Sequence, residues 1–348
     1  MNIVILSGGS GNDALMQGLI NHGYADSIKV ITNAYDNGKS TGVCRLVTDT
    51  LGVSDIRKNH FRMYKYKYKD DLNQGLVEFY SGRYDLGENP EQFCIEKLEN
   101  WGLSFLTGYV EAFFKFPLSK EFKEYKDFSI SNIVYSAMYT RIGYEATHKY
   151  FCNLLGINDF VILNSLDNVY ISATTKSGNY VRGEERIVEY KNSDDPIVKI
   201  RYSNDYYDGI SLNPKAVELI ESLSSDDLLI ISTGTFWSSI YPTLDYGKFY
   251  EYVNKACCKK LWVINTEEDK DSYGVSSTKF IEYMEKLGLN LEEFTILHNL
   301  DGKESLYEAQ KTYLGMCYAH MGNNNGKNDP ELYYRAISSL YRLNEYDE

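Results

Sequence analysis

The sequence predicts an α/β protein, with a doubly wound and mainly parallel sheet, a helical insertion and a small β-hairpin region. Two observations carry this prediction. Short apolar runs alternate with helix-like segments toward both ends of the 348-residue chain, which is typical of parallel strands joined by crossover helices. The middle of the chain is first mostly helical and then alternates with period two, which indicates segments inserted into the sheet fold.

The first thirty residues predict a βαβ unit. NIVIL, residues 2–6, is a short apolar run of the kind found in buried strands, and residues 12–21 carry apolar side chains at helical spacing. SIKVIT, residues 27–32, follows as a second strand. Because such units are almost always right-handed and parallel, this start favours a Rossmann-like sheet.

We predict one domain over residues 1–348, with a mostly helical insertion at 53–156 and a β-rich insertion at 159–203. The clearest helix begins after Ser129, a good N-cap residue, and ends near Gly156. In the second insertion KSGN is a hairpin turn, and the predicted strands are residues 159–163, 168–175 and 179–190.

The parallel-sheet pattern returns after Asn213-Pro214, which is expected to begin a helix with Asn as the cap. Gly288 is expected to end another helix, over 276–287, and two helices are expected to close the chain, the second begun by Asp329-Pro330. The remaining predicted strands are residues 227–232, 260–265 and 294–299.

The composition excludes several classes of protein. Lys and Arg number 36 against 49 Asp and Glu, a net charge of −13, which argues against binding nucleic acid or anionic membranes. Neither a signal peptide nor an apolar run long enough to cross a membrane is expected. The six cysteines form no CxxC pair, so we expect reduced thiols, a cytoplasmic location and no structural zinc.

Three polar turns follow three predicted strands, at residues 7–12, 33–42 and 232–239. Ligands of open α/β sheets bind beyond the carboxyl ends of the strands, so these turns are predicted to meet in one crevice.

The first turn, SGGSGND, suits an anion. The backbone N–H groups of Gly8, Gly9 and Gly11 could approach a phosphate, the following helix adds partial positive charge, and Ser10 offers a hydroxyl. The turn is neither GxGxxG nor a Walker A loop. A tight structural connection between strand and helix therefore remains the alternative.

The second turn, NAYDNGKSTGVCR at 33–45, is rich in reactive groups. Asp36 at the end of a strand could bind magnesium, orient a ribose or accept a proton; a solvated loop is the alternative. The basic and aromatic stretch at 53–70 is typical of single-stranded nucleic-acid binding. Since acidic residues flank it, we instead expect most of its lysines in solvent, with Arg57 and Asp55 directed into the crevice.

The third turn, STGTFWSSIYP at 232–242, offers hydroxyls and backbone amides, with a capped helix start as the alternative. His60 and His148 stand isolated in the sequence and receive no catalytic role. The spacing of residues identifies no Ser/His/Asp set.

Together the motifs resemble the CofD-like superfamily, which includes the 2-phospho-L-lactate transferases and the YvcK-like gluconeogenesis-factor proteins of the UPF0052 group. The resemblance runs from residue 3 to about residue 287. It rests on seven motifs in order: SGGSG, NAYDNGKSTG, SDIR at 54–57, SISNIV at 129–134, GEERI at 183–187, STGTFWSSIYP and VINT at 263–266.

The resemblance implies a Rossmann-like core that binds nucleotide diphosphates or nucleotide sugars. Transferase members pass a phospholactyl group from a guanosine diphosphate-linked donor to a flavin-like alcohol, with magnesium, whereas gluconeogenesis-factor members bind nucleotide sugars and resemble regulators. This chain departs from the family pattern where Tyr35 replaces the first Asp of a pair, Phe128 replaces His, Ser131 replaces Gly, and Ser232-Thr233 replace Gly-Pro.

We therefore predict a transferase that moves a phosphoryl-linked group from a nucleotide diphosphate conjugate to a hydroxyl acceptor. The alternative is a non-catalytic nucleotide-sugar-binding regulator of carbon metabolism or cell-wall synthesis. Asp36, Arg45 and Arg57 are the candidate catalytic residues, and Asp36 is the candidate Mg²⁺ ligand. No nucleic-acid or membrane partner is expected, and a homodimer is one option. The candidate nucleotide-binding residues are Gly8, Gly9, Ser10, Gly11, Asn33, Asp55, Asn132, Ser232, Thr233, Gly234, Thr235 and Asn265.

Overall fold

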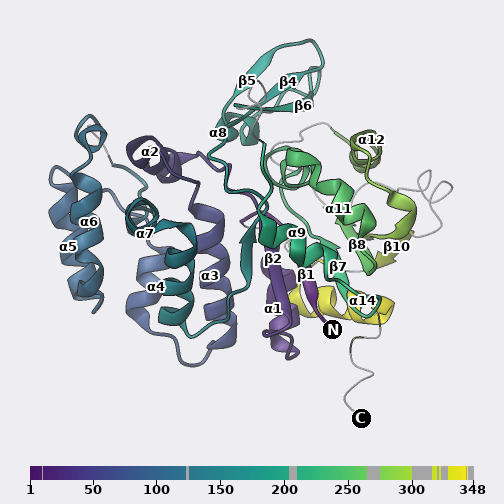
Figure 1. Ribbon diagram of the computed structural model, residues 1–348, viewed down its shortest axis with the longest axis horizontal. Coiled ribbons are helices and arrows are strands. Elements are labelled where there is room, and N and C mark those ends of the chain that lie inside the picture. Colours follow the sequence, from purple (N-terminus) through teal and green to yellow (C-terminus); the bar gives the residue numbers. More distant parts are fainter. Residues whose placement is uncertain are drawn as a thin grey trace.

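The structure is a computed structural model that describes residues 1–9, 11–122, 125–203, 210–264, 275–299, 316–319, 321–322, 328–341 and 343. Within these residues a parallel seven-stranded sheet has the order β10-β9-β8-β7-β1-β2-β3 (Figure 1). Its strands are β1 (Ile3–Leu6), β2 (Ile28–Thr32), β3 (Val161–Leu163), β7 (Leu228–Ile231), β8 (Lys259–Ile264), β9 (Phe294–Asn299) and β10 (Met316–Ala319). Chain order reverses between β1 and β7, so the predicted doubly wound, Rossmann-like fold is confirmed.

Helices cover both faces of this sheet. Ile3 and Ile5 of β1 face one apolar core, while Val4 and Leu6 face the other. Burial on both sides explains why the strands are continuous apolar runs. The first core is covered by α1 (Asp13–Asn21), α3 (Ser54–Lys67), α7 (Ile130–Leu155) and α14 (Pro330–Tyr341), and the second by α9 (Pro214–Glu221), α11 (Phe249–Lys255) and α12 (Ser277–Leu287).

The stretch from 53 to 156 is helical, as predicted, and lies beside the sheet (Figure 1). Helix α7 follows Ser129 and ends at Gly156, which has a positive φ, and a second positive φ at Gly143 breaks it in the middle. The other helical elements here are α4 (Gln74–Ser81), α5 (Pro90–Asn100), η1 (Ser104–Leu106), α6 (Thr107–Phe114) and η2 (Pro117–Lys120).

One helix was not predicted in the second turn. Residues 39–45 were expected to be loop, but they begin helix α2 (Lys39–Thr48). Glycine and threonine lower its helix propensity, which hid the helix in the sequence. Burial of Cys44 and Val47 against the first core stabilises it instead.

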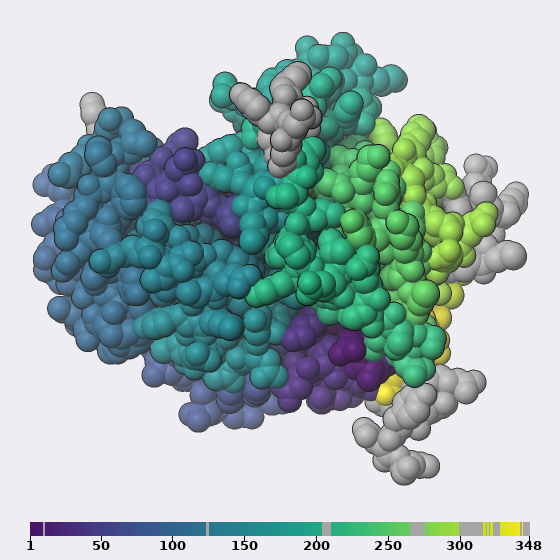
Figure 2. Space-filling model, in the orientation of Figure 1, coloured from purple at the N-terminus to yellow at the C-terminus, as the bar shows by residue number. Residues whose placement is uncertain are grey.

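A separate three-stranded antiparallel sheet, β5-β4-β6, protrudes from the molecule (Figure 2). Its strands are β4 (Ile171–Thr175), β5 (Tyr180–Arg182) and β6 (Ile197–Tyr202), and KSGN joins β4 to β5 as predicted. Residues 184–188, predicted as strand, form helix α8 (Glu184–Val188), because Gly183 turns the chain with a positive φ. Strand β3, at the start of the predicted β-rich stretch, pairs with β2 in the large sheet.

The remaining predicted elements of the second half are also found. Asn213 caps α9, Gly288 ends α12 and Pro330 begins α14. The first predicted closing helix lies outside the described residues, and β10 was not predicted. The short elements are η3 (Phe236–Ile240, a π-helical turn), α10 (Tyr241–Asp245), η4 (Tyr246–Lys248) and η5 (Leu291–Glu293). Among the helices described, none has the length and apolar character needed to cross a membrane.

Candidate functional site

The three polar turns follow β1, β2 and β7, which are neighbours in the sheet. The hydroxyl of Thr233 donates to the carbonyl oxygen of Gly11 at 2.5 Å. The side-chain amide of Asn33 donates to the carbonyl oxygen of Ser239 at 3.0 Å. These bonds place the three turns side by side at the point where strand order reverses, the usual ligand position of such sheets.

The glycines of the first turn are needed for close packing. A Cβ added at Gly11 would overlap the carbonyl oxygen of Thr233, one at Gly9 would overlap the Asp55 carboxylate, and one at Gly8 would overlap Ser239. Neither Gly8 nor Gly9 has a positive φ, so at these two positions space rather than backbone conformation requires glycine. Ser10 lies outside the described residues, and its role stays a prediction.

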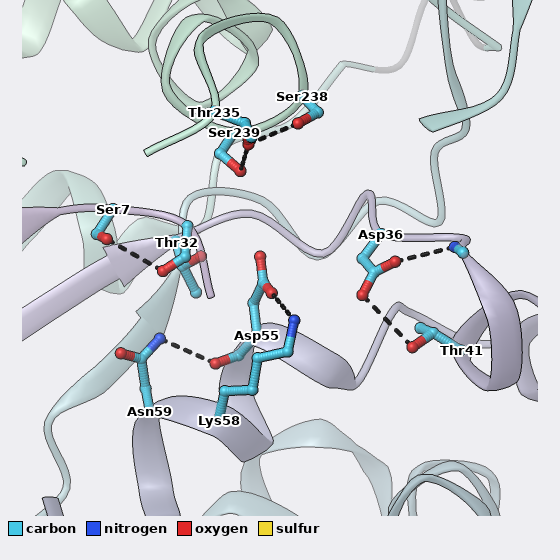
Figure 3. A network of polar contacts seen from close by, with 12 residues as sticks. Ser7, Thr32, Asp36, Thr41, Asp55, Lys58, Asn59, Thr235, Ser238 and Ser239 are labelled. Carbon is cyan, nitrogen blue, oxygen red and sulfur yellow. Dashed lines mark hydrogen bonds and ion pairs between the residues drawn. The ribbon is translucent and has the colours of Figure 1, made fainter. Parts of the chain in front are cut away.

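Two carboxylates lie at this site: Asp55 packs against the glycine turn, and Asp36 lies at the start of α2. Asp36 follows β2 and accepts a hydrogen bond from the N–H of Gly38 at 2.9 Å. Asp55 is buried in the first turn of α3, and its Oδ1 lies 3.3 Å from Nζ of Lys58. Figure 3 shows the Asp36 carboxylate directed to the start of α2, where the Thr41 hydroxyl donates to its Oδ2 at 3.4 Å, and the Asp55 carboxylate beside Lys58, on the side of the hydroxyls of Thr235 and Ser239.

The electrostatics of Asp55 favour a bound cation. Burial raises the pKa of the Asp55 carboxyl, Lys58 opposes this rise, and the negative charge of Asp36 adds to it. A cation beside Asp55 would offset both its burial and the negative charge of Asp36, and carboxylate oxygens are ligands that Mg²⁺ prefers. The residues present therefore fit the magnesium that the sequence predicted at Asp36.

The sequence analysis did not single out Lys58, since it expected most lysines of this stretch in solvent. Its side chain passes over the first turn, so that a Cβ at Gly9 would lie 2.9 Å from Cδ of Lys58. The available signal was its spacing from Asp55, since residues three apart on a helix are neighbours. Lys58 brings a positive charge to the glycine turn.

Arg57 and Asn132 lie behind the start of α2 and are both buried. The guanidinium of Arg57 donates to the carbonyl oxygen of Tyr80, but its Nε has no hydrogen-bond partner among the described residues. Burial, followed by the nearby charge of Arg83, lowers the pKa of Arg57 to about 10. Asn132 donates to the hydroxyl of Ser40 at 3.0 Å, and its buried Oδ1 likewise finds no partner in the described part of the chain.

Arg45 has a structural role instead of the predicted catalytic one. It is fully buried, and its guanidinium makes five hydrogen bonds, which occupy all of its N–H donors. It also stacks over the ring of Tyr170 at 4.0 Å. With no donor left to face the crevice, Arg45 cannot stabilise a leaving phosphate. Its acceptors are the carbonyl oxygens of Tyr35, Asp36, Thr50 and Val169 and the side chain of Asn168.

The other predicted nucleotide-binding residues divide into two groups. Asn33 and Thr233 are buried and hold the turns together through the bonds given above, and Ser232 is also buried. Gly234 and Thr235 are partly exposed at the mouth of the third turn. The hydroxyl of Thr235 accepts from Ser238 at 2.7 Å and lies 2.9 Å from that of Ser239. Asn265 lies outside the described residues.

Comparison with known proteins assigns the family. The model of the family described as 2-phospho-L-lactate transferase CofD matches residues 3–318. This chain belongs to the CofD family. The resemblance predicted from the sequence motifs is thereby confirmed.

Two similar proteins carry gluconeogenesis-factor names. A putative gluconeogenesis factor of Aquifex aeolicus (strain VF5) is 25% identical over 268 residues, which is 76% of this chain and 67% of the relative. The gluconeogenesis factor of Bacillus subtilis (strain 168) is 24% identical over 265 residues, with the same two shares.

A solved structure shares the fold of this CofD-family chain. The crystal structure of a UPF0052 family protein from Bacillus halodurans superposes with a TM-score of 0.71 at 14% sequence identity. The match covers 97% of this chain and 98% of that one. At this identity the similarity establishes the α/β fold alone.

Proposed function

We propose that this CofD-family protein binds a nucleotide diphosphate conjugate together with Mg²⁺ in the crevice and transfers its phosphoryl-linked group to a hydroxyl acceptor. The observation that carries the proposal is the pair of carboxylates: Asp55 packs against the glycine turn, and Asp36 is close enough for its charge to raise the pKa of Asp55. Mg²⁺ held by these carboxylates would neutralise charge on the diphosphate.

The chain's own groups supply the rest of the phosphate site. The N–H groups of Gly8, Gly9 and Gly11 lie just before α1, whose N-terminus attracts anions. Asp13 in the first turn of α1 would oppose an anion, but Arg62 pairs with its carboxylate at 2.8 Å. Lys58 supplies a positive charge at the same turn.

The reaction is a displacement at phosphorus. The acceptor oxygen forms a bond to the phosphorus of the transferred group, the bond from that phosphorus to the bridging oxygen breaks, and the hydroxyl proton passes to water. Arg57 is the candidate for stabilising the charge that develops on the leaving phosphate. A fixed cation in a buried setting is most effective at this step.

Substitution of Asp36 tests the proposal. Asp36→Asn keeps the shape but removes the charge, so turnover should fall by about 10²-fold or more, far more than nucleotide affinity falls. Purified protein, labelled nucleotide diphosphate conjugates, alcohol acceptors and Mg²⁺ provide the assay. Asp49→Asn is the matched control, because Asp49 is exposed at the left-handed end of α2, where Asn is well tolerated. Unchanged turnover in Asp36→Asn would remove Asp36 from the chemistry.

A second candidate function is favoured by two buried aromatic side chains. Tyr35, at the position of the family's first Asp, is fully buried and packs edge-on against Tyr202 and Tyr246. Phe128, at the position of the family's His, is buried in the first core. Loss of these two polar groups favours a nucleotide-sugar-binding regulator without turnover, in keeping with the names of the relatives. In the same assay, binding of nucleotide sugars without product would support this alternative.

A further inference from the structure

Three potential metal ligands meet in the core between α3 and α7. His60 lies on α3, and His148 and Cys152 lie four residues apart on one face of α7. All three are buried, with exposed fractions of 0%, 4% and 3%. Their donor atoms lie within 4.8 Å of one another. Sequence spacing indicated no structural zinc and could not reveal this cluster, because the two helices are far apart along the chain.

Each histidine is oriented by a hydrogen bond through one ring nitrogen. Nδ1 of His60 lies 2.8 Å from the hydroxyl of Tyr135, and Nε2 of His148 lies 2.6 Å from Oδ1 of Asp159. The other two nitrogens, Nε2 of His60 and Nδ1 of His148, face each other at 2.7 Å. Metal-binding histidines characteristically direct their second nitrogen to an oxygen in this way, which fixes the tautomer and the ring orientation.

We propose that His60, His148 and Cys152 bind a Zn²⁺ ion. Two imidazoles and a thiolate are a ligand set that suits zinc, and three protein ligands leave one tetrahedral position for water. On binding, the thiol proton of Cys152 is released and a zinc–sulfur bond replaces the sulfur–hydrogen bond.

The observed distances are close to those that zinc requires. With Zn–N bonds of about 2.1 Å and a Zn–S bond of about 2.3 Å, tetrahedral angles place nitrogens about 3.4 Å apart and sulfur about 3.6 Å from nitrogen. Sγ of Cys152 already lies 3.8 Å from Nε2 of His60. It also lies 3.8 Å from Nε2 of His148, the nitrogen that faces Asp159, so binding through Nδ1 requires the His148 ring to turn toward the metal. The two rings need to separate by less than about 1 Å. Gly143 has non-helical backbone angles and breaks α7 in two, so the segment that carries His148 and Cys152 is separate from the segment before it.

Zinc at this position would brace the helix that carries the candidate site. His60 follows Asp55 and Arg57 within two turns of α3. Bonds from His60 through the metal to α7 would hold α3 against α7. The carboxylate of Asp55 and the guanidinium of Arg57, at the start of α3, would thereby be held in place. The metal site does not depend on the proposed reaction, because its ligands lie in the core and not in the crevice.

Metal titration of the full-length chain without an affinity tag tests the proposal. A Cys257→Ser background removes an exposed thiol that would bind metals adventitiously. We expect equimolar Co²⁺ binding with the charge-transfer absorption of a cobalt–thiolate bond and the visible bands of a tetrahedral ion, and displacement by Zn²⁺. Elemental analysis after dialysis should then find equimolar Zn²⁺. Only trace metal, or a Co²⁺ spectrum without the thiolate band, would overturn the proposal.

Three variants separate zinc binding from packing. Cys152→Ser should abolish the thiolate band, while Cys94→Ser, which alters another buried cysteine, should retain it. Asp159→Asn changes a side chain that is 51% exposed, so the fold is not at risk. It should weaken Zn²⁺ binding by about 10- to 100-fold through the orientation of His148. A thiolate band that persists in Cys152→Ser would contradict the assignment.

Discussion

Gly11 joins the first turn to the third. Its carbonyl oxygen accepts the Thr233 hydroxyl, and its Cα faces the Thr233 carbonyl group so closely that no side chain fits. A side chain added at Gly11 would be costly because it meets backbone atoms, which cannot rotate aside as a flexible side chain does. Gly11 therefore sets the distance between the two loops that flank the switch point.

Gly11→Ala should destabilise the protein by about 2–3 kcal/mol, because the methyl group must push apart the backbones of two loops. Urea unfolding monitored by circular dichroism measures this loss. Gly108→Ala is the control: Gly108 is exposed in α6 with nothing within 4 Å of an added Cβ, and alanine there should be neutral or slightly stabilising. Equal stability of the two variants would show that the first turn tolerates a wider spacing.

At the scale of single residues, the sequence predicted Asp36 and Asp55 near the crevice, but it assigned Arg45 wrongly and did not single out Lys58. The reason is sequence distance. Arg45 bonds to Asn168 and Val169, which lie 123 and 124 residues away, and a lone arginine in a polar segment does not reveal such acceptors. The same limit hid the cluster around His60, whose partner His148 is 88 residues distant.

At the scale of elements, hydrogen bonds to the Asp227 side chain join the starts of β1 and β7, at the end of the strands opposite to the crevice. Asp227, which precedes β7, accepts from the backbone N–H of Asn2 at 2.5 Å and from that of Ser224 at 2.9 Å. Burial alone would raise the pKa of Asp227, but the hydrogen bonds from Asn2 and Ser224 outweigh it and lower the pKa below the ordinary value. The ionised carboxylate therefore stabilises the central strand pair.

Asp227→Asn should cost about 2 kcal/mol at neutral pH, because a charged acceptor of several hydrogen bonds becomes neutral. Since the folded pKa lies below the ordinary value of about 3.8–3.9, this stability is complete above that value and lost as pH falls through the folded pKa. Chemical unfolding at a series of pH values should show wild type and variant converging in acid. Asp226→Asn, at the exposed neighbouring position, should behave as wild type, and a pH-independent difference for Asp227→Asn would contradict the charge-based explanation.

Most elements were predictable because local pattern and burial agree. Strands such as β1 and β7 are apolar on both faces, which needs no knowledge of their partners. The misses occur where local signals conflict with tertiary packing. Helix α2 forms despite its glycine and threonines, α8 has strand-like residues after a glycine turn, and β10 is a short parallel strand added at the edge of the sheet.

At the scale of the whole molecule, the candidate site is built from both halves of the doubly wound sheet. The turns after β1 and β2 belong to one half, and the turn after β7 belongs to the other. Between these strands the chain forms the helical segment and the small sheet, whose helix α8 approaches the second turn: the N–H of Glu185 donates to Oδ1 of Asn37 at 3.3 Å. A ligand in the crevice would therefore contact parts of the chain that are distant in sequence.

A ligand that binds only the folded state should raise the melting temperature. At a concentration about a hundredfold above Kd the stabilisation is about 2.7 kcal/mol, which corresponds to a shift of several degrees for a protein of this size. We expect this shift from a guanosine or uridine diphosphate or its conjugate, enlarged by Mg²⁺ because of Asp36 and Asp55. Free bases should give none, since the proposed anchoring contacts are to phosphate. Differential scanning fluorimetry across a nucleotide panel measures the effect.

The control for this shift is Gly9→Asp, which places a carboxylate where the phosphate is proposed to lie. Because a Cβ at Gly9 would also crowd Asp55, the variant must first be shown to unfold cooperatively. A folded Gly9→Asp protein should then melt at the same temperature with and without nucleotide, while the wild type responds. If the variant keeps the full shift, the nucleotide binds elsewhere and the glycine turn serves only to pack β1 against β7. If no nucleotide of the panel changes the melting temperature of the folded wild type, the crevice binds a different class of ligand.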